Sequence, residues 1–151
     1  MKTLLFTLLV AVSALAQAPV APKRPLGVPA DAKPFNGRWY KVVLEKKSWH
    51  AARDKCKDMG GRLVCVPDAV TWEFVKTLNK GPQLWIGATD EKTTGVWEWV
   101  NGDRLKFSAW SAGQPDNAGK VQHYMILNQF GMFDDVGKNS PNTVGFICEW
   151  K

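Results

Sequence analysis

The sequence predicts an α+β domain in which two helices pack on an antiparallel sheet. Two segments before Pro82, residues 48–59 and 67–79, carry apolar side chains at the spacing of three and four that is typical of amphipathic helices. After Pro82 the pattern changes to short apolar or alternating runs separated by Gly, Asn and Pro, which indicates strands and turns. Helices followed by a run of strands, without regular alternation, favour an antiparallel sheet.

The first 16 residues have the pattern of a secretory signal peptide. Lys2 precedes an apolar run that ends in small residues at Ala16. This run is shorter than the about 20 apolar residues that span a bilayer. Cleavage after Ala16 or Ala18 fits, and Pro19 disfavours the second. We therefore expect a mature chain that starts at Gln17, has no transmembrane segment, and is extracellular, or periplasmic if the source is bacterial.

Residues 17–34 are rich in Pro and Ala and predict an extended linker, whereas residues 35–151 form one domain's length of chain. The formal net charge of +6 comes from scattered lysines, which does not favour a nucleic-acid partner. An exported chain with three cysteines, Cys56, Cys65 and Cys148, is expected to form one disulfide and leave one thiol. The residues alone allow all three pairings.

Within the domain, residues 37–45 predict a first strand. Ser48 can cap the first helix, and Gly60-Gly61 ends it. The second helix starts at Pro67-Asp68 and ends before Lys80. The expected buried faces consist of Trp49, Ala52, Cys56 and Met59 in the first helix, and of Val70, Phe74 and Leu78 in the second.

Strands are expected at residues 84–88, 96–99, 105–107, 123–127, 130–133 and 146–150. Asn101-Gly102 is a strong hairpin turn between the second and third of these. Two long loops, residues 110–120 and 136–143, interrupt the pattern. Long loops on a packed frame are usually functional or disordered, and the aspartates in this region favour function.

The stretch Gly113-Gln114-Pro115-Asp116-Asn117 places an amide and a carboxylate on either side of one proline. A cis bond at Pro115 would let Gln114 and Asp116 face one pocket. Gln122 and the pair Asp134-Asp135 follow, which gives three carboxylates and two amide oxygens in total. Oxygen ligands in that number suit calcium. The alternative is an ordinary turn followed by a solvated loop.

Four motifs in this order resemble those of a C-type lectin-like domain over nearly all of residues 35–151. They are Trp85-Ile86-Gly87, Trp97-Glu98-Trp99, the Gln114-Pro115-Asp116 stretch and Phe146-Ile147-Cys148-Glu149. The resemblance implies two helices packed on a looped double sheet with long binding loops. It also implies a disulfide between Cys56 and Cys148, which would close a loop of about 90 residues and stabilise by roughly 3 to 5 kcal/mol.

The family's second disulfide is missing, since the matching positions are Tyr124 and Lys138. Cys65 is additional, either as a small buried side chain or as a thiol that links two chains. The resemblance implies weak calcium binding by Gln114, Asp116, Gln122, Asp134 and Asp135, the first four of which would also contact the sugar. Gln122 stands where the family commonly has Glu, and Asp134 where it has Asn, so the number of carboxylates is unchanged.

The order Gln-Pro-Asp resembles the family's galactose-type motif and implies a glycan or glycoprotein partner. No aromatic follows the motif, although Trp110, Phe130 or Phe133 could stack on a sugar instead. Two other functions compete. One is calcium-independent binding of a protein or polymer on the same fold. The other is an enzyme using His50, His123 or Cys65, which is disfavoured because no paired acid and base is present.

Overall fold

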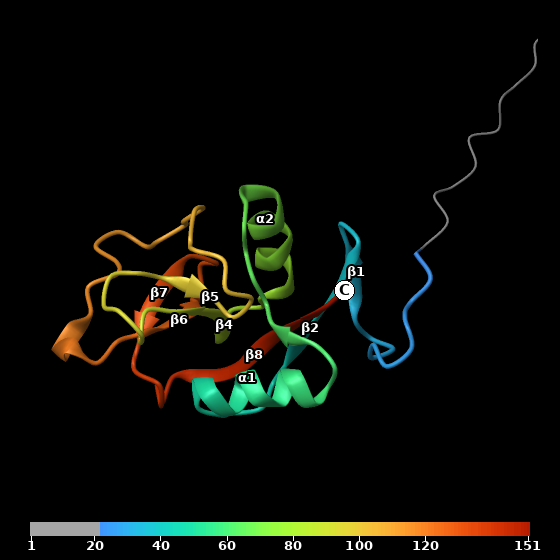
Figure 1. Ribbon diagram of the computed structural model, residues 1–151, viewed down its shortest axis with the longest axis horizontal. Helices are drawn as coiled ribbons and strands as arrows, with labels where there is room; N and C mark the ends of the chain where they lie inside the picture. The colour runs from blue at the N-terminus through green and yellow to red at the C-terminus, as the bar shows by residue number, and fades with distance from the viewer. Residues whose placement is uncertain (1–21) are drawn as a thin grey trace, which may run out of the picture.

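A computed structural model describes residues 22–151, so the expected signal peptide and residues 17–21 of the expected linker lie outside the described residues. In that part of the chain two helices and eight strands form one layered domain (Figure 1). The elements are β1 (Lys33–Phe35), β2 (Arg38–Val43), α1 (Trp49–Asp58), β3 (Arg62–Leu63), α2 (Ala69–Leu78), β4 (Gln83–Thr89), β5 (Glu98–Trp99), β6 (Tyr124–Leu127), β7 (Phe133–Val136) and β8 (Thr143–Trp150), with a short 3-10 turn at Ala118–Lys120.

The strands join in the order β1-β2-β8-β4-β6-β7, with β3 beside β8 and β5 beside β4. The α+β fold is confirmed, but the sheet is mixed rather than wholly antiparallel, because β4 and β8 run parallel. After β7, residues 137–142 carry the chain back to the end of the sheet at which β7 began. β8 therefore runs parallel to β7 and not antiparallel to it. β8 occupies the centre between β2 and β4 and is buried over almost its whole length.

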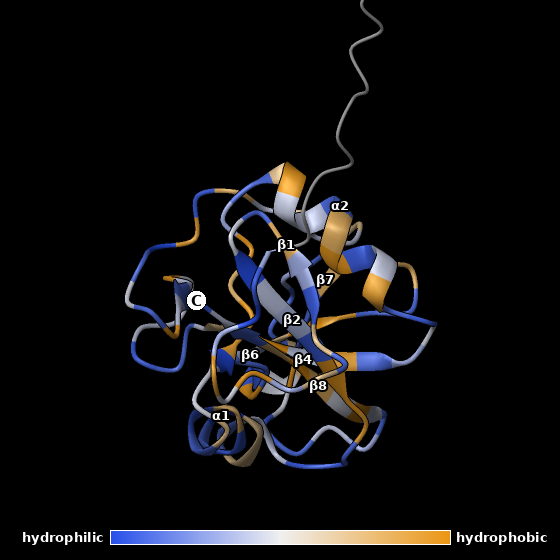
Figure 2. Cartoon of the chain, turned by 90° about the vertical axis from the view of Figure 1, so that its right-hand side faces the viewer, coloured by the Kyte–Doolittle hydropathy of each residue, from blue (hydrophilic) through white to orange (hydrophobic). Residues whose placement is uncertain are grey.

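The two helices cover opposite faces of the sheet, and each face has its own apolar cluster (Figure 1). Trp49, Ala52 and Cys56 of α1 pack with Trp85 and Phe146 on one face. Val75 of α2 packs with Ile86, Met125 and Ile147 on the other. Figure 2 shows β4 and β8 largely in the orange of hydrophobic residues, whereas β1 and β2 are mostly pale or blue. Neighbouring residues of β8 serve different clusters because strand side chains alternate between faces.

Side-chain caps start both helices where the sequence predicts them. Ser48 Oγ accepts a hydrogen bond from Ala51 N at 3.3 Å, and Asp68 Oδ1 accepts one from Thr71 N at 2.7 Å. The predicted buried face of α1 is confirmed. That of α2 is wrong at Val70, which is 64% exposed, because the helix turns Thr71 and Val75 inward instead.

The packed domain begins earlier than the composition indicates. Val28 and Ala32, inside the expected linker of residues 17–34, are buried in the cluster under α1. Asp31 pairs with Lys41 Nζ at 2.9 Å, and β1 starts at Lys33. Two small apolar side chains between prolines are enough to hold this segment against the domain, and a bias towards Pro and Ala does not reveal such anchoring.

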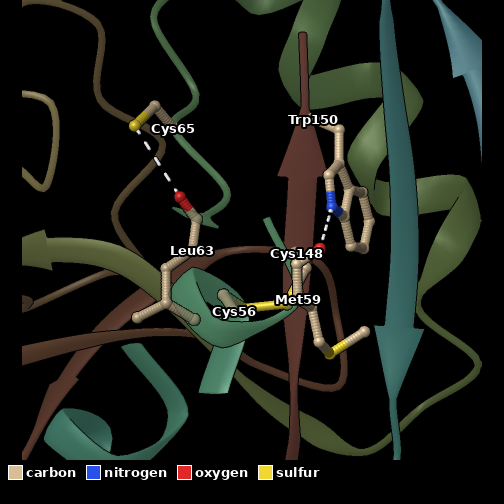
Figure 3. Close-up of a disulfide and its surroundings, with 6 residues drawn as sticks. All are labelled: Cys56, Met59, Leu63, Cys65, Cys148 and Trp150. Atoms are coloured by element: carbon tan, nitrogen blue, oxygen red, sulfur yellow. Dashed lines mark hydrogen bonds between the residues drawn. A yellow bond between two sulfur atoms is a disulfide. The ribbon is translucent and has the colours of Figure 1, made fainter. Parts of the chain in front are cut away.

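The disulfide between Cys56 and Cys148 is present and links α1 to the central strand (Figure 3). Trp150 Nε1 donates to Met59 O at 2.9 Å beside it, which ties the end of α1 to the same strand. Cys65 is a free, buried cysteine whose Sγ lies 3.8 Å from Leu63 O. Burial raises the pKa of the Cys65 thiol to about 12. This agrees with a small buried side chain and not with a link between chains.

The long loops and the chain ends lie at opposite ends of the domain. β1 and the C-terminal residue lie together, while the loops that join β5 to β6 and β7 to β8 lie at the far end of the sheet (Figure 1). No helix within residues 22–151 is long and apolar enough to cross a bilayer.

Candidate functional site

The peptide bond between Gln114 and Pro115 is cis, the arrangement that would let Gln114 and Asp116 face one pocket. Gln114 Oε1 accepts a hydrogen bond from Asp116 N at 2.9 Å. The same N–H also lies 3.1 Å from Asp135 Oδ1 of β7. Gln114 and Asp116 are thus joined to each other and to the strand that carries the acidic pair.

Asp135 is the anchor of this loop and not a residue of a solvated loop. It lies inside β7, is 1% exposed, and accepts a second bond from Asn117 N at 2.8 Å through Oδ2. The sequence hides this strand because Asp is disfavoured in strands. The expected strand at residues 130–133 is therefore shifted to Phe133–Val136. Removing the carboxylate would leave the N–H of Asn117 unpaired, at a cost of about 1–3 kcal/mol when buried, and would leave Asp116 N only its bond to Gln114 Oε1.

Gln122 joins the network from the other end of the loop. Its Oε1 accepts from Ala118 N at 2.7 Å, and its own N–H donates to Asn117 Oδ1 at 3.0 Å. Asn117, which the sequence reasoning omitted, thus contacts both Gln122 and Asp135. Asn117 adopts φ 45°, in the left-handed region. Asn occupies this region more readily than most residues, so an Asn after Pro-Asp is the feature of the sequence that indicates such a turn.

Asp134 lies next to Asp135 but has no side-chain hydrogen bond to any described residue. Burial first, and then the charges of Asp135 and Asp116, raise the pKa of Asp134. The pKa of Asp135 is also raised, chiefly by burial, although the N–H groups of Asn117 and Asp116 oppose this. Three carboxylates therefore affect one another, and a nearby cation would favour their charged forms.

The donor set has the chemistry of a calcium site. Gln114 Oε1 and Gln122 Oε1 each accept one N–H and retain a second lone pair. However, within residues 22–151 no three His, Cys, Asp or Glu side chains converge closely enough to hold a metal among themselves. Calcium at this site would therefore depend on the two amide oxygens as well as the carboxylates.

Both positions of the missing second disulfide are tied to α1 by other contacts. Tyr124 OH donates to Glu91 Oε2 at 2.6 Å, and its ring lies 5.2 Å from that of Trp49. Lys138 O accepts from Trp49 N at 3.0 Å. The N-terminal end of α1 thus holds the loops on either side of the site.

The histidines considered for catalysis are engaged in pairs with carboxylates. His50 Nε2 lies 2.9 Å from Glu91 Oε2, and His123 Nδ1 lies 2.9 Å from the buried Asp90. These two pairs connect separate segments of the chain, α1 to the loop after β4, and that loop to the start of β6.

Of the three aromatics that could stack on a sugar, only one is largely exposed. Phe133 is fully buried, and Trp110 packs against Trp97 and Phe133. Phe130 is 76% exposed in the turn between β6 and β7.

Comparison with known proteins agrees with this fold. The sequence is 34% identical over 104 residues to "Hepatic lectin" of Gallus gallus, covering 68% of this chain and 50% of that protein, so this chain spans about half the length of that relative. It is 30% identical to "Perlucin-like protein" of Mytilus galloprovincialis, covering 82% of this chain and 83% of the relative. The mouse scavenger receptor C-type lectin carbohydrate-recognition domain superposes with a TM-score of 0.77 at 30% identity, covering 82% of this chain and 97% of that domain.

The proteins matched are lectins and lectin-like binding domains, which are non-catalytic. The model of the lectin C-type domain matches residues 45–150. This match covers well over half of the sequence and contains every residue of the hydrogen-bonded network around Pro115. The chain therefore belongs to the C-type lectin domain family.

Proposed function

We propose that this chain is an exported lectin module that binds galactose-type sugars through a calcium ion. The observation that carries the proposal is the hydrogen-bonded network that gathers oxygens of Gln114, Asp116, Gln122 and Asp135 beside Asp134. Calcium, when bound, would neutralise the carboxylates and offer coordination positions to two vicinal sugar hydroxyls. The disulfide fits an oxidising compartment, and mass spectrometry of the exported protein should find Gln17 at its N-terminus.

The arrangement around Pro115 supports the sugar class. An amide stands before the proline and a carboxylate after it, so Gln114 can donate as well as accept, whereas ionised Asp116 can only accept. A mannose-type motif has the reverse order. The order therefore sets which of two neighbouring hydroxyls donates and which accepts.

Calcium is expected to raise the melting temperature of the parent protein. A ligand that binds only the folded state at 100 times its Kd stabilises by about 2.7 kcal/mol, which for a domain of this size is a shift on the order of 10 °C. Asp116→Ala should abolish the shift with little change in the melting temperature without calcium, because Asp116 is exposed. Differential scanning fluorimetry with calcium and with chelator measures both.

Asp58→Ala is the matched control, since it removes an exposed carboxylate at the end of α1, away from the network. It should retain the shift. Asp135→Ala is unsuitable because it also removes two hydrogen bonds of the loop. A parent protein that melts at the same temperature with millimolar calcium and with chelator would exclude the calcium mechanism.

Exchanging the two side chains around Pro115 is expected to reverse the sugar preference. In the double variant Gln114→Glu with Asp116→Asn, the donor changes sides, and binding should move from galactose-type towards mannose-type ligands. One mismatched, buried hydrogen bond costs about 1–3 kcal/mol, which predicts a change in relative affinity of about tenfold or more. Retention on galactose and mannose columns checks this, and an unchanged preference would contradict the galactose assignment.

The second candidate function is calcium-independent binding of a protein or polymer. Its support is that backbone N–H groups already donate to five of these oxygens, one each of Gln114, Asp116 and Gln122 and both of Asp135. A solved structure entitled calcium-independent type II antifreeze protein shares the fold with a TM-score of 0.73 at 22% identity. An unchanged melting temperature in calcium, together with ligand binding in chelator, would favour this alternative.

A further inference from the structure

The domain has a concave surface beside the candidate site. It is a cavity of about 710 Å³ between the segment 120–124, which leads into β6, and the loop 136–142, which leads into β8. Trp49 N donates to Lys138 O at 3.0 Å, and Ser140 N donates to Gly137 O at 2.9 Å, so α1 and a tight turn fix one wall. Both positions of the missing disulfide, Tyr124 and Lys138, line the cavity. A volume of this size is typical of a small-molecule site.

The charged groups that line this cavity are all basic. Lys120 and Lys138 are both exposed, and neither forms an ion pair with any residue of the described chain. His123 is a third basic side chain, and its partner Asp90 is 3% exposed and outside the lining. No Asp or Glu lines the cavity within the described residues. Two unpaired ammonium groups without an opposing carboxylate favour an anionic ligand.

The cavity shares Gln122 with the site proposed for the sugar. Gln122 lines the cavity and also accepts the hydrogen bond from Ala118 N that closes the Pro115 loop. Tyr124 and Val136 add apolar lining, against which the carbon face of a sugar ring can pack. A saccharide longer than one residue that is bound at the loop can therefore extend past Gln122 towards the lysines.

We propose that this cavity is a subsite for the anionic substituent of an acidic saccharide, a sulfate ester or a carboxylate, held by Lys120 and Lys138. The inference rests on the proposed glycan binding for the position of the neutral sugar, but the cavity and its charges are independent of calcium. Lysine ammonium groups bind such anions as point charges. The attraction is therefore sensitive to ionic strength, since both groups are exposed to solvent.

Three forms of one galactose-containing disaccharide test the subsite, namely a neutral, a sulfated and a uronate form. At low ionic strength and in calcium, calorimetry should show that the sulfated or the uronate form binds the parent protein at least fivefold more tightly than the neutral form. The stronger of the two identifies the anion. This gain should shrink at 0.5 M salt. The double variant Lys120→Ala with Lys138→Ala should lose the gain and keep its affinity for the neutral form.

Lys57→Ala with Lys106→Ala is the matched control, because it removes the same charge from exposed positions outside the cavity and should retain the gain. Equal affinity for all three forms, or a gain that survives in the Lys120 and Lys138 variant, would overturn the subsite. A third outcome separates the two proposals. If an acidic form binds in chelator through both lysines and the neutral form does not bind, the subsite is supported and the calcium mechanism is rejected. An absence of binding by all three forms would reject both.

Discussion

Replacing Cys56 and Cys148 together by serine is expected to lower the free energy of unfolding by about 4–5 kcal/mol. The bridge joins residues 92 apart in sequence, and in the chain-entropy model a disulfide stabilises mainly by restricting the unfolded chain, more for longer loops. Both sulfurs are buried between α1 and β8, so their loss also leaves two polar hydroxyls in the apolar cluster. Urea denaturation followed by tryptophan fluorescence measures the change.

Cys65→Ala provides the control for this variant. It removes a buried thiol, 5% exposed, but leaves the bridge intact, and it is expected to cost about 1 kcal/mol. Reduction of the parent protein should lower its stability somewhat less than the double variant, because it leaves two thiols instead of two hydroxyls in the apolar cluster. The double variant itself should not respond to reductant. Equal stability of the parent and the double variant would show that apolar packing alone fixes α1 on β8.

Arg62→Ala is expected to destabilise the fold by on the order of 3 kcal/mol near neutral pH. Arg62 Nε donates to Glu149 Oε1 at 2.6 Å, and Arg38 lies 3.8 Å from the same oxygen. Glu149 is 2% exposed, and removing one partner of a buried ion pair leaves a charge without compensation. The value is at the lower end for buried pairs because Arg62 itself is one-third exposed.

The cost should depend on pH in a defined direction. Burial raises the pKa of Glu149, although Arg62 and Arg38 oppose the shift. A carboxyl with a raised pKa in the folded state stabilises the fold while it is protonated, and this contribution is lost as the pH rises through the folded pKa. Without Arg62 that pKa rises further. The deficit of the variant should therefore be small near pH 4 and widen towards pH 8, as urea denaturation across this range would show.

The double variant Arg62→Ala with Glu149→Gln separates charge from packing. With a neutral amide in place of the carboxylate, the dependence of the deficit on pH should disappear. Arg53→Ala, which breaks a solvent-exposed pair with Asp54, should cost well under half as much at any pH. A deficit for Arg62→Ala that stays constant from pH 4 to pH 8 would contradict the role of the buried charge.

The sequence predicts those parts of the fold whose signals are local. Ser48 and Asp68 cap helices by bonds to residues three positions away, and the spacing of Trp49, Ala52 and Cys56 identifies the face of α1. The buried face of α2 is less certain from the pattern alone. Thr71 and Val75 are buried against the rest of the domain. Val70 has the same side chain as Val75 but faces solvent. Which face of α2 is buried depends on the shape of the strand surface against which the helix packs.

The sequence indicates the residue types of the candidate site but not the strand and hydrogen bonds that hold them in place. Gln114 and Asp116 are joined by a hydrogen bond, and Gln122 is bonded to Ala118 of the same loop. Asp135 was expected in a loop, because two adjacent aspartates are typical of loops. Only the pairing of this segment with β6 shows that it is a strand. The basic cavity is not apparent in the sequence, because Lys120 and Lys138 are brought to one surface by segments that lead into different strands.

The loop around Pro115, which we propose as the binding loop, lies opposite both ends of the described chain, and this placement has a consequence for avidity (Figure 1). A copy that is held at β1 or at its C-terminal residue would direct the Pro115 loop away from its support. Several copies on a common support would then engage a branched or repeating ligand at once. Such linkage converts later binding events into intramolecular ones and can raise the overall affinity by about 10²–10⁴ without any new contact.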